Sequence, residues 1–230
     1  MDIVFSIHQP NYLPWLGFFY KIKNSDLFVL LDAVNVPRGQ SVANRNKILG
    51  PNGPFYLTVP LNKKKFNNGI FTYLEAEFAD ETWREKHLKS IEHTYKKSPY
   101  FNLFFPVIQK LYMDDSLSFC EHNIRFIEEV CSFYNIKTPI IRLSKILNKF
   151  GQKNQLIIDI AKAINANVYL CGMGGGLEYT TPELLMQQAN IKTIFTSFVH
   201  PSYPQFNSKK FVSHLSIIDY IFNSGKEMIF

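Results

Sequence analysis

The side chains best suited to chemistry in this sequence gather between Ile7 and Trp15. His8 carries an imidazole, the one side chain that ordinarily exchanges a proton near neutral pH. Prolines at positions 10 and 14 fix φ and deny the segment between them a regular hydrogen-bond ladder. This stiff, polar loop predicts the floor of a small-molecule site. The substrate-contacting side chains that we expect there are Gln9, Asn11, Tyr12 and Trp15.

Two further polar clusters follow along the chain. Asp32 ends the apolar run 26–32, which reads as a buried strand, so its carboxylate is a candidate base or orienting group; the alternative is a helix cap or a turn. Residues 35–52 form a polar stretch with little periodicity, which predicts a long loop. Within it, Arg45 and Lys47 between the amides of Asn44 and Asn46 suit recognition of a phosphate or carboxylate. The alternative is a solvated loop.

The third cluster is the glycine-rich segment 172–176, between the apolar run 166–171 and a helix that begins at Pro182. Here Gly172, Gly174 and Gly175 let the backbone approach a phosphate and offer amide donors. The spacing is neither that of a P-loop nor that of the dinucleotide fingerprint, and a flexible turn is the alternative.

His87 recurs with Trp83, Ile91 and Tyr95 on one helical stripe. It is either a substrate contact or a histidine satisfied within the core.

The elements that must position these residues alternate between strands and helices, which predicts an α/β fold with a mostly parallel, Rossmann-like three-layer sheet. Strand patterns occur at 3–7, 26–32, 55–61, 71–76, 138–143, 166–171 and 191–195. An all-helical insertion is expected at about 80–136 and a helical tail at about 206–230. We expect a single domain over residues 1–230.

Composition narrows the class of protein. A chain of 230 residues with 46% hydrophobic residues is expected to be folded, and its net charge of +6 favours anionic partners such as nucleotides, phosphorylated sugars, nucleic acid or a membrane surface. The lysines are scattered, which argues against a nucleic-acid face. Three cysteines without metal-ligand spacing predict reduced thiols and no metal site. Without a basic leader or an apolar run of ~20 residues, the chain is expected to be cytoplasmic with no membrane span.

The motif His8-Gln9-Pro10-Asn11-Tyr12-Leu13-Pro14-Trp15, together with the Asn44–Lys47 segment and the turn after Cys171, resembles the WbqC-like family of bacterial proteins over essentially the whole chain. Members of this family look to be encoded among the genes for O-antigen (lipopolysaccharide) and other surface polysaccharides. A role as a glycine transferase has been proposed for the family, so the resemblance implies that setting. The family usually carries Ser at the position of Cys171 and Pro at that of Met173. A weaker likeness to nucleotidyltransferases concerns the fold alone.

The resemblance and the residues together lead to the hypothesis of an acyl or aminoacyl transferase, or an ATP-dependent amide ligase, that acts on a nucleotide-linked amino sugar. His8 would be the general base and Asp32 would orient it, while Arg45 and Lys47 would bind the pyrophosphate. ATP would be required if the acyl donor is a free amino acid; otherwise the donor is a carrier or a thioester. The alternative function is a non-catalytic nucleotide-sugar-binding protein.

Overall fold

The computed structural model describes residues 2–39, 41–65, 69–174 and 180–228. The chain forms two compact units, which are described separately below. Unit 1 comprises residues 1–9, 20–33 and 136–198, and unit 2 comprises residues 10–19, 34–135 and 199–230. The prediction of a single domain over residues 1–230 stays a prediction.

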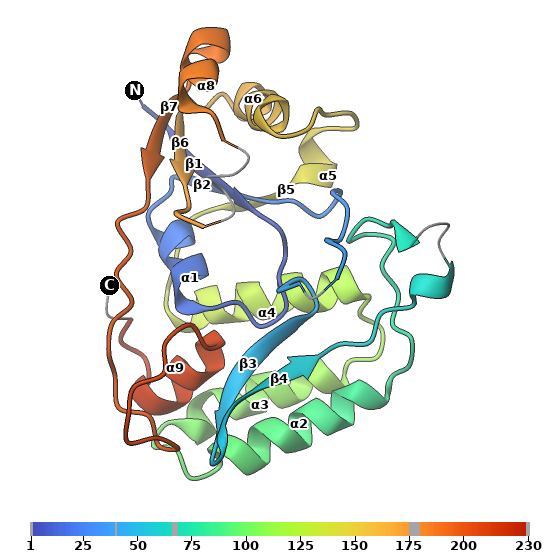
Figure 1. Ribbon diagram of the computed structural model, residues 1–230, viewed down its shortest axis with the longest axis vertical. Helices are drawn as coiled ribbons and strands as arrows, with labels where there is room; N and C mark the ends of the chain where they lie inside the picture. The colour runs from blue at the N-terminus through green and yellow to red at the C-terminus, as the bar shows by residue number, and fades with distance from the viewer. Residues whose placement is uncertain (1, 40, 66–68, 175–179, 229–230) are drawn as a thin grey trace. The chain divides into compact units, whose positions relative to one another are not determined.

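Unit 1 is built on a five-stranded parallel sheet with the order β5-β2-β1-β6-β7 (Figure 1). The strands are β1 (Val4–His8), β2 (Leu27–Leu30), β5 (Ile140–Arg142), β6 (Val168–Cys171) and β7 (Lys192–Phe195). Counted along the chain, the third strand is followed across the sheet by the second, first, fourth and fifth. This is the order of the doubly wound Rossmann fold, which confirms the predicted mostly parallel α/β architecture.

Apolar runs explain why these strands occupy the centre of the unit. Phe5, Phe28, Val29 and Leu30 are all fully buried, as expected for parallel strands whose two faces are both covered. The helices of the unit are α5 (Leu143–Ile146), α6 (Asn154–Ala163), α8 (Pro182–Ala189) and the second half of α1 (Leu16–Lys23). Helix α5 lies in a segment, 144–153, that reads as a polar linker in the sequence.

Unit 2 contains a two-stranded antiparallel hairpin, β3 (Arg45–Gly50) and β4 (Gly53–Thr58). The prediction of a structureless loop over residues 35–52 is therefore wrong for its second half. Ile48 and Leu49 are buried, and pairing with β4 satisfies the backbone of a segment whose side chains are mostly polar. The predicted strand at 71–76 is also wrong, because these residues form turns with a single bridge from Thr72 to Asn35.

The other regular elements described in unit 2 are helices, and the predicted helical tail at about 206–230 is helical over Ile217–Ser224. These helices are α2 (Thr82–Tyr95), α3 (Phe101–Met113), α4 (Phe119–Phe133) and α9 (Ile217–Ser224), with a short 3-10 helix at Lys63–Lys65. Consecutive helices α2, α3 and α4 pack on one another, and α9 packs on α3 and β3 (Figure 1). Ser118 caps α4 by accepting a hydrogen bond from the Glu121 amide, and Gly225 ends α9 at a φ of 76°. Within the described ranges, no helix is both long and apolar enough to cross a membrane.

Candidate functional site

In unit 1, the candidate site lies at the carboxyl ends of β1 and β6. These two strands are neighbours, and the order of the sheet reverses between them, which is where open α/β sheets bind ligands. β1 ends at His8 and β6 ends at Cys171, which is followed by Gly172. We use the name switch-point site for a group of four residues: His8, Lys21, Cys171 and Gly172. The sheet therefore brings together His8, from the loop after β1, and Gly172, the first residue of the glycine-rich segment after β6.

His8 is half-buried at the end of β1, and its Nδ1 lies 3.1 Å from the Gln9 carbonyl oxygen. Loss of solvent around the ring, followed by the positive charge of Lys21, lowers the pKa of His8 to about 3. The imidazole is therefore uncharged at neutral pH and able to accept a proton. A base with so low a pKa is weak, however, so the free protein does not present His8 in the form of a strong general base.

Lys21 is the residue of this site that the sequence analysis missed. Its side chain is 7% exposed, and its Nζ donates a hydrogen bond of 2.9 Å to the carbonyl oxygen of Ile7, next to His8. Burial lowers the pKa of Lys21 to about 8. In the sequence it reads as a surface lysine in the last turn of a helix, where cations commonly stabilise the dipole.

Asp32 belongs to unit 1 and is fully buried, and both of its carboxylate oxygens bind Ser144 at the start of α5. Oδ1 accepts from the Ser144 amide at 2.9 Å, and Oδ2 accepts from its hydroxyl at 2.5 Å. These bonds match the alternative reading of a cap, while the role of Asp32 in orienting His8 stays a prediction.

The glycine segment is described only in part. A Cβ at Gly174 would meet open space, whereas Gly175 lies outside the described residues. Cys171 is fully buried, with its Sγ 3.5 Å from the Gly172 carbonyl oxygen.

In unit 2, the loop residues 10–15 are held by a network of amides. Leu13 adopts a φ of 44°, a conformation that a bulky residue rarely adopts and that stores strain. Asn46, which is 8% exposed, donates to the Leu13 carbonyl oxygen at 2.6 Å and so fixes the loop on β3. Asn11 accepts a long 3.5 Å bond from Tyr73, and Asn44 donates to the Val59 carbonyl oxygen. These contacts place Asn11, Asn44 and Asn46 in the framework of unit 2.

Arg45 and Lys47 project from alternate positions of β3, so they share one face of the hairpin. The Arg45 guanidinium lies 3.5 Å from the ring centroid of Tyr56, and the Lys47 ammonium lies 5.4 Å from it. Hydrogen bonding from Arg45 lowers the pKa of the exposed Tyr56 phenol. The two cations that the sequence singled out are therefore together, on a surface that presents an aromatic ring between them.

Trp15 stacks on two histidines that the sequence analysis did not single out. Its ring centroid lies 5.2 Å from that of His214 and 6.3 Å from that of His200, with interplanar angles of 26° and 19°. We call these three residues the aromatic platform. A Cβ at Gly17 would stand only 2.6 Å from the Trp15 Cζ2 atom, so a glycine there lets the indole lie over the start of α1.

Tyr12 and His87 meet in a buried cluster that also contains Tyr112 and His122; we call it the His–Tyr cluster. The Tyr12 hydroxyl lies 2.8 Å from His87 Nδ1 and forms a very short hydrogen bond with the Tyr112 hydroxyl. Burial lowers the pKa of His87 to about 4. His87 is therefore a satisfied histidine within the core of unit 2, which is the alternative that the sequence left open, and its role as a substrate contact stays a prediction.

His122 is fully buried, and neither ring nitrogen has a hydrogen-bond partner among the described residues. Its ring stacks on Tyr12 and packs edge-on against Trp83 and Tyr112. Burial and then the positive charge of Arg84 lower the pKa of His122 to about 3. No sequence signal separates this histidine from the solvent side of its helix.

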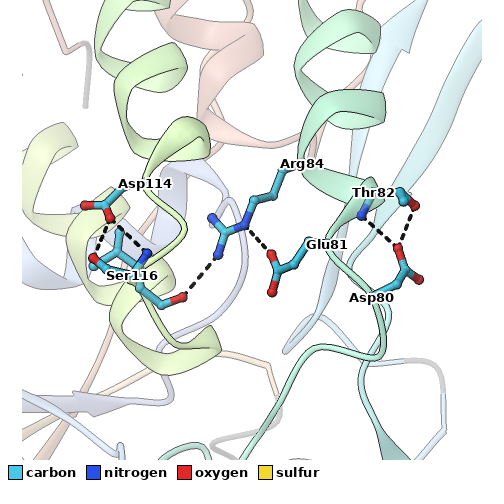
Figure 2. A network of polar contacts seen from close by, with 7 residues as sticks. Asp80, Glu81, Thr82, Arg84, Asp114 and Ser116 are labelled. Carbon is cyan, nitrogen blue, oxygen red and sulfur yellow. Dashed lines mark hydrogen bonds and ion pairs between the residues drawn. The ribbon is translucent and has the colours of Figure 1, made fainter.

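Arg84 ties α2 to the connection that precedes α4, as Figure 2 shows. Its Nε donates to Glu81 Oε2 at 2.5 Å, and Nη2 donates to the Leu117 carbonyl oxygen at 3.1 Å. Asp80 and Asp114 bind the hydroxyl and amide groups two residues further along the chain and shape the adjoining turns (Figure 2). This network holds the helices around the His–Tyr cluster.

In the described part of the chain, no group of three or more His, Cys, Asp or Glu side chains is placed to hold a metal ion. The chemically active groups described in unit 1 are instead His8 and Lys21, at the switch point of an α/β sheet.

Comparison with known proteins defines the class. The model of the WbqC-like protein family matches residues 9–229, and this chain belongs to that family. A relative is the uncharacterized protein Rv1507c of Mycobacterium tuberculosis, which is 25% identical over 228 residues, covering 96% of this chain and 94% of the relative. No solved structure matches the chain.

Proposed function

We propose that this protein is an acyl or aminoacyl transferase that acts on a nucleotide-linked amino sugar in O-antigen or other surface-polysaccharide biosynthesis, with a glycyl group as one candidate. Membership of the WbqC-like family is consistent with this function. The observation that carries the proposal is the position of the His8 imidazole at the end of β1, at the switch point of the sheet and close to Lys21.

Amide formation requires the sugar amine to attack the acyl carbonyl carbon. As the new C–N bond forms, the carbonyl π electrons move to oxygen; they return when the donor's leaving group departs, and the amine loses a proton. His8 accepts that proton in this proposal, because only an uncharged imidazole can do so. If the donor is a free amino acid, ATP first activates its carboxylate; otherwise the donor arrives on a carrier or as a thioester.

Unit 2 supplies groups suited to a nucleotide. The aromatic platform is a set of stacked rings suited to extension by a base, and Arg45 and Lys47 are cations suited to a pyrophosphate. The partners proposed are accordingly small molecules, namely a nucleotide-linked amino sugar and an acyl or amino-acid donor.

The test is incubation with a panel of nucleotide-linked amino sugars, glycine and ATP, followed by mass spectrometry. A glycyl mass increment on the sugar is expected with the native protein and should fall by about 10²-fold or more in His8→Gln. His93→Gln, a change at an exposed histidine of α2, is the matched control and should retain turnover. Full turnover by His8→Gln would refute the role of His8.

A second function, binding of a nucleotide sugar without turnover, is favoured by two observations. The pKa of His8 is far below the value that suits a base at neutral pH, and both Asp32 oxygens are engaged by Ser144. Saturable binding of a nucleotide sugar together with no product from any donor would select this function.

A further inference from the structure

Lys21 is unusual because its amino group is buried and has no carboxylate partner among the described residues. A lysine ammonium has three N–H donors, and the one described bond is the 2.9 Å bond to the Ile7 carbonyl oxygen. Among the described residues, Lys21 forms no ion pair with an aspartate or glutamate. Buried charges are ordinarily paired, because removing an ion from water without a partner is strongly unfavourable.

The Lys21 ammonium lies near the carboxyl ends of β1 and β6, beside Ile7 and Gly172. Nζ would lie 4.0 Å from a Cβ at Gly172, so the glycine that follows β6 is a direct neighbour of the ammonium. Its charge also acts on His8 and interacts with Cys171, the last residues of β1 and β6. The cation therefore lies at the carboxyl ends of the strands, where parallel α/β sheets bind their ligands, and its neighbour Gly172 has no side chain.

We propose that Lys21 binds an oxyanion, the carboxylate or phosphate group of a small molecule, at the switch-point site. The ligand then supplies the counter-charge that no described aspartate or glutamate provides, and Gly172 places no side chain beside the ammonium. The inference concerns binding and does not depend on transferase activity. A bound anion also opposes the Lys21 charge at His8, so the pKa of His8 should rise from about 3 when the site fills.

Isothermal titration calorimetry tests the proposal with four probes at neutral pH and constant ionic strength: phosphate, pyrophosphate, acetate and glycine. Saturable binding of the phosphate probes assigns a phosphate group to Lys21, and saturable binding of acetate or glycine assigns a carboxylate. In Lys21→Met, which keeps the aliphatic stem, affinity should fall at least about tenfold. Lys23→Met, a change at an exposed lysine of the same helix, is the matched control and should bind as the native protein does.

A second measurement needs no variant and so does not depend on how Lys21→Met folds. The pH titration of His8, followed by NMR of its ring Cε1–H group, should shift to higher pH when the binding probe is present. The proposal is overturned if none of the four probes saturates, if Lys21→Met binds as tightly as the native protein, or if phosphate or pyrophosphate saturates the site and leaves the His8 titration unmoved.

Discussion

His122 makes the stability of unit 2 depend on pH in a way that can be worked out from its burial. Its pKa is lowered from 6.5 to about 3, so the folded state holds the neutral ring while the unfolded chain takes up a proton below pH 6.5. The stabilisation is therefore complete above pH 6.5 and is lost as the pH falls toward about 3. On going from about pH 8 to about pH 5, this one group should remove about 2 kcal/mol from the free energy of unfolding.

The perturbation that isolates this effect is His122→Leu. Because the ring nitrogens have no partner among the described residues, an apolar side chain of similar size leaves no described donor or acceptor unpaired there. At about pH 8 we expect the variant to lie within ~1.5 kcal/mol of the native protein. At about pH 5 the variant should have gained about 2 kcal/mol relative to it, since it escapes the proton uptake.

The assay is urea unfolding at both pH values, followed by tryptophan fluorescence. Both tryptophans, Trp15 and Trp83, lie in unit 2, and Trp83 packs edge-on against His122 at 5.2 Å. His93→Leu is the control, because that side chain is exposed in α2 and its removal should leave the native pH response. Equal losses of stability in the native protein and His122→Leu between the two pH values would refute the reasoning, since other titrating groups are common to both.

Two further predictions concern packing in unit 2. Gly17→Ala should displace the Trp15 indole from the aromatic platform, because the new Cβ would meet the ring; a changed fluorescence spectrum would report it, and an unchanged one would contradict it. Tyr95→Phe should destabilise the protein by about 2 kcal/mol and Tyr203→Phe by about 1 kcal/mol, measured by urea unfolding. The difference follows because the Tyr95 hydroxyl donates to Asp219 and also accepts from the Leu49 amide of β3, whereas the Tyr203 hydroxyl donates to Asp219 and accepts from no backbone amide among the described residues; equal losses would contradict it.

The fold could be predicted where the sequence has a strong period. Continuous apolar runs such as 26–32 predict buried parallel strands, and the alternating apolar positions of 117–134 predict α4, because burial imposes these patterns directly. The hairpin strand β3 could not be predicted in this way. Its stability comes from pairing with β4 and from the packing of Ile48 and Leu49, neither of which the polar neighbours at 44–47 reveal.

The C-terminal helix α9 shows the same limit. Asp219 and Asn223 lie four residues apart, a spacing that reads as one polar face, yet they are 0% and 8% exposed. The carboxylate of Asp219 accepts hydrogen bonds from Tyr95, Tyr203 and Gln205, which replace water as its partners. Buried polar residues are satisfied by groups distant in the chain, and local spacing carries no record of them.

The cations on β3 and the Lys21 cation differ in how much each would gain from binding an anion. Arg45 lies over the exposed ring of Tyr56, where solvent already stabilises its charge, so an anion would gain little there unless several contacts act together. Lys21 is buried without a described carboxylate, so an anion that reaches it replaces solvation that the fold has removed. The sequence indicated Arg45 because of its amide neighbours, whereas Lys21, in the last turn of a helix, gave no signal that sets it apart from other helix-terminal lysines. Position in the sheet reverses that ranking, since the residue at the switch point has the greater need of a counter-charge.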